Sequence, residues 1–365
     1  MNNIQCYICG GAVRDTLLGL DPKDIDYVWT GITPDFMINK GYQQVGADFP
    51  VFLDQYGDQH ALARIERKID VGYNGFSCIF DTTVTIEDDL LRRDLTINSM
   101  AVKIEDWEAF KLTKCRELLI DPYNGLDDIN NGILRATSNA FREDPIRILR
   151  TARFVARYDF TVDPDTINLM QNIVHELEFI PTERIWAEIS KGLMEKHPLK
   201  MFQILSLCCA FEHPILKPFG NYHIKALRSN IDDLPLECRF VLCSYNFFDD
   251  SDYEKLSIPN NCSSLAKLYH HTNGFISGYD KLCSEGKLAL LTDTRSFNNT
   301  DQIELLFTIM SVYDIAKKPF IPDLIRKDIQ SLKQLNLTEL TKGMKNGKDI
   351  QRLIENKRLW ILNQN

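Results

Sequence analysis

The sequence lacks the features that would place the protein in or beyond a membrane. No run of about 18 apolar residues is present, so we expect no membrane-spanning helix and no membrane partner. The amino-terminal residues show no basic start followed by an apolar stretch, so we do not expect secretion. The ten cysteines have no regular spacing, which is typical of reduced thiols in a cytosolic protein. We therefore expect a cytoplasmic location.

An excess of basic charge is absent as well. The formal net charge is −9, which argues against a protein that coats nucleic acid non-specifically but leaves room for a local basic face. Hydrophobic residues make up 44% of the chain and charged residues 25%, so extensive disorder is excluded. A length of 365 residues allows two or three domains, and the composition leaves the oligomeric state unknown.

The spacing of apolar residues changes along the chain. Short strand-like runs alternate with glycine turns up to about residue 135, and helical spacing dominates afterwards. This pattern predicts an α+β fold, with an α/β head that has a mixed sheet, followed by an all-helical neck, body and tail. We expect the head at residues 1–135, the neck at 136–210 and the body and tail at 211–365. The expected strands are Gln5–Ile8, Ile25–Trp29, Phe49–Leu53, His60–Arg64 and Ile97–Lys103, and the expected helices include Ala12–Leu18, Ile185–Met194, Leu199–Ala210 and Ile303–Ile315.

The first chemical motif joins a glycine turn to a pair of acids. Gly10 and Gly11 lie between a predicted strand and a predicted helix, where backbone N–H groups can approach an anion, and Arg14 can add a contact to a phosphate. Asp24 and Asp26 point to one face of the next strand, and carboxylates in this arrangement suit Mg²⁺. A pair of solvated acids at a strand edge is the alternative. The short distance between the two motifs favours a site for nucleotidyl transfer.

The second motif places two arginines beside acids at the start of an apolar segment. In the functional interpretation Arg93 contacts a phosphate, and Asp94 or Asn98 contacts a ribose hydroxyl. The alternative is that these charges are simply solvated.

The third motif is a helix that we expect to begin near Glu143. Four arginines, at positions 147, 150, 153 and 157, fall within about one third of its circumference. Such a stripe of like charge repels itself unless something anionic meets it, and a polyphosphate or an RNA backbone would do so.

Asp144 and Arg147 are three residues apart and can lie side by side on that helix. Arginine donates hydrogen bonds and a carboxylate accepts them, so the pair matches the Watson–Crick edge of cytosine or adenine and rejects guanine and uracil. The alternative is an intrahelical salt bridge.

These motifs resemble those of the class II CCA-adding tRNA nucleotidyltransferases. The similarity runs in family order from residue 4 to about residue 210. It is carried by residues 7–15 (YICGGAVRD), 23–27 (KDIDY), 47–53 (ADFPVFL), 72–76 (GYNGF), 92–98 (RRDLTIN), 121–129 (DPYNGLDDI), 143–154 (EDPIRILRTARF) and 181–188 (PTERIWAE).

The resemblance implies a role for each matching residue. Asp24 and Asp26 would be the catalytic metal ligands, with Glu66 as a further carboxylate, and Glu143 would brace the base-selecting arginine. Residues 67–76 would form a mobile loop involved in the switch from C to A addition. The implied nucleotide-binding residues are Gly11, Arg14, Arg93, Asp94, Asn98, Asp144, Arg147, Arg150 and Arg153.

The implied activity is the addition or repair of the 3′-terminal CCA of tRNA from CTP and ATP, with Mg²⁺ as the cofactor and the tRNA 3′ end as the partner. A poly(A) polymerase of the same superfamily, an enzyme that adds only CC or only A, and a non-catalytic tRNA-binding protein are the alternatives. The chain contains no His-Asp dipeptide, so we expect no phosphohydrolase activity of the HD type. The lysine- and arginine-rich last fifty residues are either a tRNA-binding tail or a solvated helix face.

Overall fold

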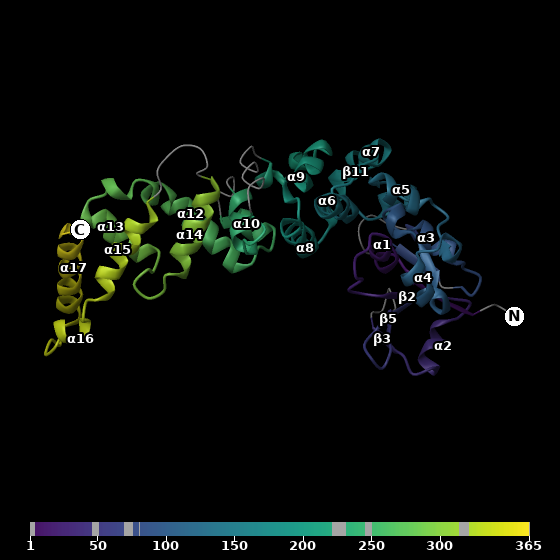
Figure 1. The fold of residues 1–365 in the computed structure, drawn as a ribbon, viewed down its shortest axis with the longest axis horizontal. Coiled ribbons are helices and arrows are strands. Elements are labelled where there is room, and N and C mark those ends of the chain that lie inside the picture. The colour runs from purple at the N-terminus through teal and green to yellow at the C-terminus, as the bar shows by residue number, and fades with distance from the viewer. Residues whose placement is uncertain are drawn as a thin grey trace. The chain divides into compact units, whose positions relative to one another are not determined.

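The computed structural model describes residues 4–45, 51–68, 76–79, 81–220, 231–244, 250–313 and 321–364. The chain divides into two compact units, Met1–Lys217 and Pro218–Asn365 (Figure 1). The first unit contains every described strand and the second is built from helices. The α+β fold class is therefore confirmed, while our finer division at residues 135 and 210 stays a prediction.

A seven-stranded mixed sheet forms the centre of the first unit, in the order β3-β4-β5-β2-β1-β8-β9. Its neighbouring strands run antiparallel except for β2 and β5, which are parallel. Two short strand pairs, β6 with β7 and β10 with β11, lie outside it. The strands are β1 Gln5–Cys9, β2 Asp26–Thr30, β3 Gln43–Val45, β4 Val51–Leu53, β5 Gln59–Leu62, β6 Ile65–Lys68, β7 Phe76–Ile79, β8 Ala101–Lys103, β9 Leu119–Ile120, β10 Ile133–Leu134 and β11 Thr161–Val162. The helices that accompany them are α1 Gly11–Leu17, α2 Pro34–Asn39, α3 Ile86–Leu91, α4 Trp107–Thr113 and α5 Gly125–Asn131.

The register of β1 and β2 brings the first motif together. Cys9, at the end of β1, lies opposite Asp26, at the start of β2. The chain leaves β1 through Gly10, whose φ of 69° suits glycine, and enters α1 at Gly11. The glycine turn and the acidic start of β2 therefore share one edge of the sheet.

The predicted strand at Ile97–Lys103 is partly wrong. Thr96–Asn98 forms a 3₁₀ turn, and only Ala101–Lys103 is a strand, β8. The backbone of Thr96 packs so closely against Gly125 that a Cβ there would lie 2.3 Å from the Thr96 carbonyl oxygen. The apolar run is fully buried as expected, but burial alone does not separate a strand from a tight helical turn. Of the predicted strand Phe49–Leu53, the first two residues lie outside the described residues.

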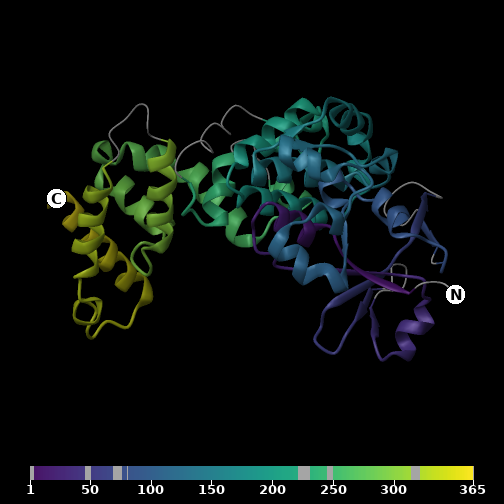
Figure 2. The same ribbon diagram turned by 45° about the vertical axis from the view of Figure 1, so that its right-hand side comes forward.

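Helix α6, Ile146–Tyr158, packs against α8, Thr182–Leu193, and α9, Pro198–Leu207, and the three lie together in both views (Figures 1 and 2). It begins later than predicted, because Asp144 precedes a proline and is extended. Helix α7, Pro164–Ile173, completes this part of the unit. The apolar arc of α6 is buried as expected, at Ile148, Leu149, Ala152, Val155 and Ala156.

The second unit is held together by helix pairs. Helix α10 packs against α12 and α14, and α17 packs against α13 and α15. Among the residues that the structure describes, no helix has the length and apolar character needed to cross a membrane. The helices are α10 Leu236–Cys243, α11 Asp250–Lys255, α12 Asn260–Ser277, α13 Ser284–Asp293, α14 Asp301–Tyr313, α15 Pro322–Lys333, α16 Leu337–Leu340 and α17 Gly347–Gln364.

Candidate functional site

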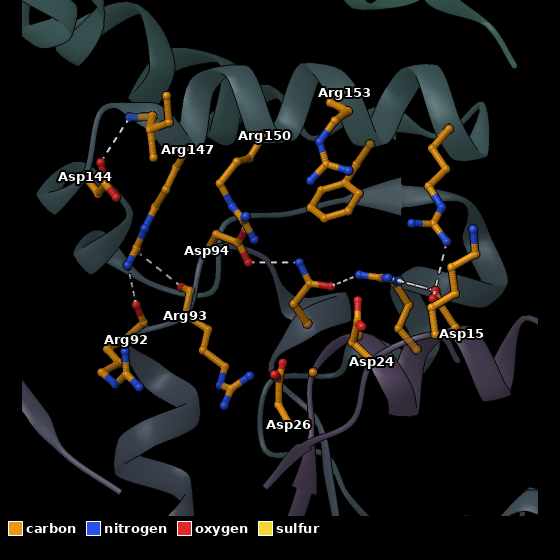
Figure 3. A pocket seen from close by; sticks show the side chains of 18 of the residues that line it. Asp15, Asp24, Asp26, Arg92, Arg93, Asp94, Asp144, Arg147, Arg150 and Arg153 are labelled. Atoms are coloured by element: carbon orange, nitrogen blue, oxygen red, sulfur yellow. Dashed lines mark hydrogen bonds and ion pairs between the residues drawn. The ribbon is translucent and has the colours of Figure 1, made fainter. Parts of the chain in front are cut away.

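A pocket of about 540 Å³ in the first unit collects the three sequence motifs (Figure 3). It is lined by the glycine turn and α1, the start of β2, the segment after α3, and helices α6 and α8. The two predicted metal ligands and the predicted nucleotide-binding residues all line it, namely Gly11, Arg14, Asp24, Asp26, Arg93, Asp94, Asn98, Asp144, Arg147, Arg150 and Arg153. Gly10 of the predicted glycine turn and Arg157 of the predicted arginine stripe line it as well, together with Asp15, Lys23, Arg92, Ile146, Phe154 and Arg184, to which we gave no role from sequence.

Asp24 and Asp26 are both exposed and lie across the pocket from the arginines of α6 (Figure 3). Ile25, between them, is half-buried, as the alternation of a strand predicts. Two carboxylates that remain open to water fit a hard divalent cation, which keeps several water ligands. Among the described residues no group of three or more His, Cys, Asp or Glu side chains forms a metal site. The Glu66 side chain lies outside the described residues.

Arg14 is fixed by two side chains of the pocket. Its Nε and Nη2 donate to Oδ1 of Asp15 at 2.9 and 2.8 Å, and its Nη1 donates to Oδ1 of Asn98. The N–H of Gly10 donates to the carbonyl of Met100 at 3.0 Å. The expected anion contact through the glycine turn therefore does not include the Gly10 N–H.

Arg92 and Arg93 share one buried acid. Asp89 is fully buried and its carboxylate lies 2.7 Å from Nη2 of Arg92 and 3.2 Å from Nη2 of Arg93. Burial alone would raise the pKa of Asp89, but the two guanidiniums outweigh it, and the pKa is lowered. The φ of 69° at Gly10 favours glycine here, and a Cβ at this position would lie 2.6 Å from Nη1 of Arg93 and would push the end of that side chain aside. The alternative interpretation, in which the charges of this segment are solvated, is thus wrong for Asp89.

Asp94 connects Asn98 to the arginine helix. Its Oδ1 accepts from the Leu95 N–H at 2.8 Å and from Nδ2 of Asn98 at 2.9 Å, and its Oδ2 accepts from Nε of Arg150 at 2.9 Å. Burial alone would raise the pKa of Asp94, but Arg150 and the hydrogen bonds lower it. A ribose hydroxyl could reach this carboxylate only by sharing or displacing these partners, so the ribose contact stays a prediction.

The arginine stripe of α6 is matched by carboxylates of the protein itself. Nε of Arg153 donates to Glu188 at 2.6 Å, and Arg157 lies 3.3 Å from Asp15. The ring of Phe154 lies between three guanidiniums, with centroid distances of 5.1, 5.8 and 4.6 Å to Arg14, Arg150 and Arg153. The repulsion that we expected a ligand to relieve is therefore partly relieved by these acids.

Asp144 and Arg147 occupy the other end of α6 (Figure 3). Arg147 donates to the carbonyls of Arg92 and Ala140 at 2.7 and 2.9 Å, and its backbone N–H donates to the carbonyl of Asp144 at 3.0 Å. The Asp144 carboxylate pairs instead with Nη2 of Arg184 at 3.0 Å. The two side chains therefore come together in the pocket, but each is held by a different partner.

Sequence reasoning missed the acids and the ring that hold the arginines in place. Asp15, Asp89, Glu188 and Phe154 all contact arginines of the pocket, and Arg184 lines it. Four of these five residues lie inside motifs that carry the resemblance, at residues 7–15, 143–154 and 181–188, and that position was the one available signal. Asp89 stands just before the RRD sequence in an acidic run that reads as solvated.

The pocket places exposed carboxylates opposite several guanidiniums, an arrangement that can hold a divalent cation and a polyphosphate together. Residues 6–135 match the model of the Poly A polymerase head domain, and residues 159–218 match that of the probable RNA and SrmB-binding site of polymerase A. Nucleotidyltransferases of this superfamily use divalent metals.

Curated relatives point to a narrower family. The chain is 50% identical over 210 residues to the multifunctional CCA protein of Nitrosomonas eutropha, a match that covers 57% of this chain and 48% of the relative. It is 51% identical over 208 residues to the multifunctional CCA protein of Hahella chejuensis, a match that covers 55% of this chain and 47% of the relative. The chain thus matches about half the length of these relatives. Residues 6–135 and 159–218 thus match the head domain and the RNA-binding region of polymerase A, and the relatives that match over about 210 residues are CCA proteins, in agreement with the resemblance seen in the sequence.

Solved structures share the fold over nearly the whole chain. A CCA-adding enzyme in complex with ATP has a TM-score of 0.71 at 22% identity and covers 99% of this chain and 86% of its own. The Thermotoga maritima CCA-adding enzyme complexed with tRNA has a TM-score of 0.67 at 23% identity and covers 100% of this chain and 88% of its own. At this identity the likeness establishes the fold alone.

Proposed function

We propose that the protein is a tRNA nucleotidyltransferase that builds or repairs the 3′-terminal CCA of tRNA from CTP and ATP and releases pyrophosphate. The observation that carries this proposal is one pocket in which Asp24 and Asp26 face the arginines of α6. The relatives are named multifunctional CCA proteins, which supports C and A as the nucleotides that are added. The free thiols of the described cysteines fit a reducing compartment, and we propose the cytoplasm.

Mg²⁺ is the cation that the donor set suits, with Asp24 and Asp26 as its protein ligands. When bound, Mg²⁺ would lower the pKa of the attacking 3′-hydroxyl and neutralise charge on the leaving pyrophosphate. Asp26 is the first residue of β2, which belongs to the central sheet, and Asp24 lies two residues before it, so the sheet fixes the backbone of Asp26. The two carboxylates need no further protein ligand if water completes the coordination shell.

The arginines would hold the nucleotide's phosphates in line with the tRNA hydroxyl. Arg14, Arg93, Arg150 and Arg153 line the pocket, and each guanidinium is already fixed by a carboxylate. Fixed donors lose little freedom when they bind a polyphosphate, and they stabilise charge that develops during the reaction. The positions of these arginines, rather than their number, would therefore set the affinity for the nucleotide.

Asp144 and Arg147 would select the base. The Asp144 carboxylate would accept a hydrogen bond from the amino group of cytosine or adenine, and the Arg147 guanidinium would donate one to the neighbouring ring nitrogen. Arg147 is about nine-tenths buried and held by backbone carbonyls, and Asp144 is held by Arg184, so neither side chain can turn freely to suit another base. Guanine and uracil would leave buried groups unpaired. Asp94 and Asn98 remain our candidates for the ribose.

The helical residues after about 210 would bind the tRNA body. We propose the head at 1–135, the neck at 136–210 and the body and tail at 211–365, with the basic last fifty residues on the RNA backbone.

Substitution of the two acids tests the proposal. We expect Asp24→Ala and Asp26→Ala to abolish extension of a tRNA transcript that lacks CCA, and to leave tRNA binding by gel shift nearly intact. Asp21→Ala removes an exposed acid that does not line the pocket and serves as the matched control, with extension unchanged. Extension by the Asp24→Ala/Asp26→Ala double variant would refute the metal assignment.

A further inference from the structure

Asp15 joins two helices at the edge of the nucleotide pocket. Its side chain is 9% exposed, and its Oδ1 accepts from Nε and Nη2 of Arg14 and from the Tyr158 hydroxyl at 2.9 Å. Its Oδ2 accepts from Nη2 of Arg157 at 3.3 Å. Asp15 and Arg14 belong to α1, whereas Arg157 and Tyr158 end α6. One carboxylate therefore ties the helix beside the catalytic strand to the arginine helix.

The contacts of Asp15 decide how Arg14 presents its donors. A guanidinium has five N–H groups in one plane. Two N–H groups of Arg14 donate to Asp15 and one donates to Asn98. The ring centroids of Phe154 and Tyr158 lie 5.1 and 5.2 Å from the central carbon of the Arg14 guanidinium. Two N–H groups remain for a ligand on a side chain that lines the pocket. The plane in which they lie is fixed by Asp15.

The charge balance leaves this cluster attractive to an anion. Asp15 carries one negative charge and contacts two guanidiniums, so the three groups together remain positive. Without the carboxylate, Arg14 and Arg157 would repel each other in a half-buried site and turn apart. A phosphate group is the anion that such planar donors bind best.

We propose that Asp15 is a positioning residue for the phosphates of the incoming nucleotide and acts through Arg14. This inference rests on the proposed function, in which Arg14 holds those phosphates. Both oxygens of Asp15 already accept from Arg14, Tyr158 and Arg157, so Asp15 acts through these partners, and its loss acts on nucleotide affinity rather than on the chemical step. A purely structural Asp15, in contrast, would affect folding, tRNA binding and turnover alike.

The Asp15→Asn variant keeps the size of the side chain and removes its charge. We expect the KM for CTP and for ATP to rise by about tenfold or more, because charge-assisted hydrogen bonds that orient Arg14 are lost. The KM for tRNA and kcat should stay within about threefold of the wild type. Tyr158→Phe removes one neutral donor from the same carboxylate oxygen and should change the KM for CTP by less than about twofold.

Asp128→Asn is the matched control for the loss of a buried acid. Asp128 is 6% exposed, accepts from Thr96 at 2.7 Å and from Arg135 at 3.2 Å, and does not line the pocket. Both variants should lower the unfolding temperature, but only Asp15→Asn should raise the nucleotide KM. Unfolding temperatures and the KM for tRNA are measured on the same preparations.

A double-variant cycle tests the route through Arg14. Arg14→Lys keeps the charge but loses the planar guanidinium that bonds Asp15 through Nε and Nη2 and Asn98 through Nη1. If Asp15 acts through Arg14, adding Arg14→Lys to Asp15→Asn should raise the KM for CTP by less than about threefold. Fully multiplicative effects of the two substitutions would overturn the inference.

The failures of the two proposals are distinguishable. A wild type that extends tRNA, with an Asp15→Asn variant that keeps its KM for CTP and ATP, refutes the role of Asp15 alone. An equal loss of turnover and tRNA affinity in Asp15→Asn also refutes it. A wild type that neither binds CTP in equilibrium dialysis nor extends tRNA refutes the proposed function, and the role of Asp15 with it.

Discussion

The Asp144→Asn variant should weaken the choice between nucleobases. The substitution keeps the shape of the side chain and replaces one acceptor oxygen by an N–H donor. Oδ1 of Asp144 accepts from the Ile146 N–H at 3.2 Å, and Oδ2 pairs with Arg184 at 3.0 Å. An amide can keep the first contact, but its nitrogen then faces the Arg184 guanidinium, donor against donor. The acceptor that we assign to the amino group of cytosine or adenine is weakened or lost.

The expected loss in kcat/KM follows from the strength of a hydrogen bond to a charged group. A hydrogen bond to a charged group contributes about 1.5–3 kcal/mol, which corresponds to a loss of about 10–150-fold in kcat/KM for CTP and ATP. UTP gains at most one neutral hydrogen bond to the new amide. The preference for CTP over UTP should therefore fall by about the same factor as kcat/KM for CTP, that is, by about tenfold or more. The side chain of Asp144 is 24% exposed, which favours the lower half of this range.

Single-turnover extension of a tRNA transcript lacking CCA, with CTP, ATP, UTP or GTP as the sole nucleotide, measures both quantities. Arg184→Gln is the companion variant, because it removes the partner of Asp144 but keeps the carboxylate. It should slow addition of both CTP and ATP without shifting preference toward UTP. If Asp144→Asn changes kcat/KM for CTP by less than about threefold and leaves UTP excluded, the base-selection argument is refuted.

Three further outcomes follow from the contacts of the pocket. Asp89→Asn should lower the free energy of unfolding of the first unit by about 3 kcal/mol, because Arg92 and Arg93 lose their buried charged partner. Urea unfolding measures this loss, and a loss below about 1 kcal/mol would contradict the prediction. Because the pKa of Asp89 is lowered in the folded protein, the stability gap between wild type and Asp89→Asn should be full at neutral pH and shrink as the pH falls below the ordinary value of 3.8; a gap that widens in acid would show the opposite sign. Phe154→Leu removes the ring between three guanidiniums and should raise the KM for CTP about three- to tenfold with little change in the KM for tRNA, and an unchanged KM for CTP would show that the ring does not orient them.

The residues of the pocket were predictable because local rules connect them to the fold. The alternation expected of a strand predicted Asp24 and Asp26 on one side, and both line the pocket although β2 begins only at Asp26, while a glycine turn between a strand and a helix marks the edge where they meet Arg14. The helical period gathers Arg147, Arg150 and Arg153 on the face of α6 that lines the pocket. These rules need only neighbours in sequence, and the pocket contains every residue that they selected.

The partners of the arginines were not predictable in the same way. Asp15 and Arg157 are 142 residues apart in the sequence, and Glu188 and Arg153 are 35 apart, so only the folded chain brings the partners together. The charge stripe on α6 therefore suggested a need for an external anion that the protein partly meets itself. The strand predicted at Ile97 failed because tertiary packing selected a 3₁₀ turn where the apolar pattern allowed either structure.

A nucleotide-extension assay tests the central claim most directly. Purified protein, Mg²⁺ and a tRNA transcript that lacks its 3′-CCA receive CTP, ATP or both, and products are resolved at single-nucleotide resolution. We expect two additions with CTP alone, a third only when ATP is also present, and none without a divalent cation. A long ladder with ATP alone would identify a poly(A) polymerase, and a transcript that stays unextended under every condition would contradict the proposed activity.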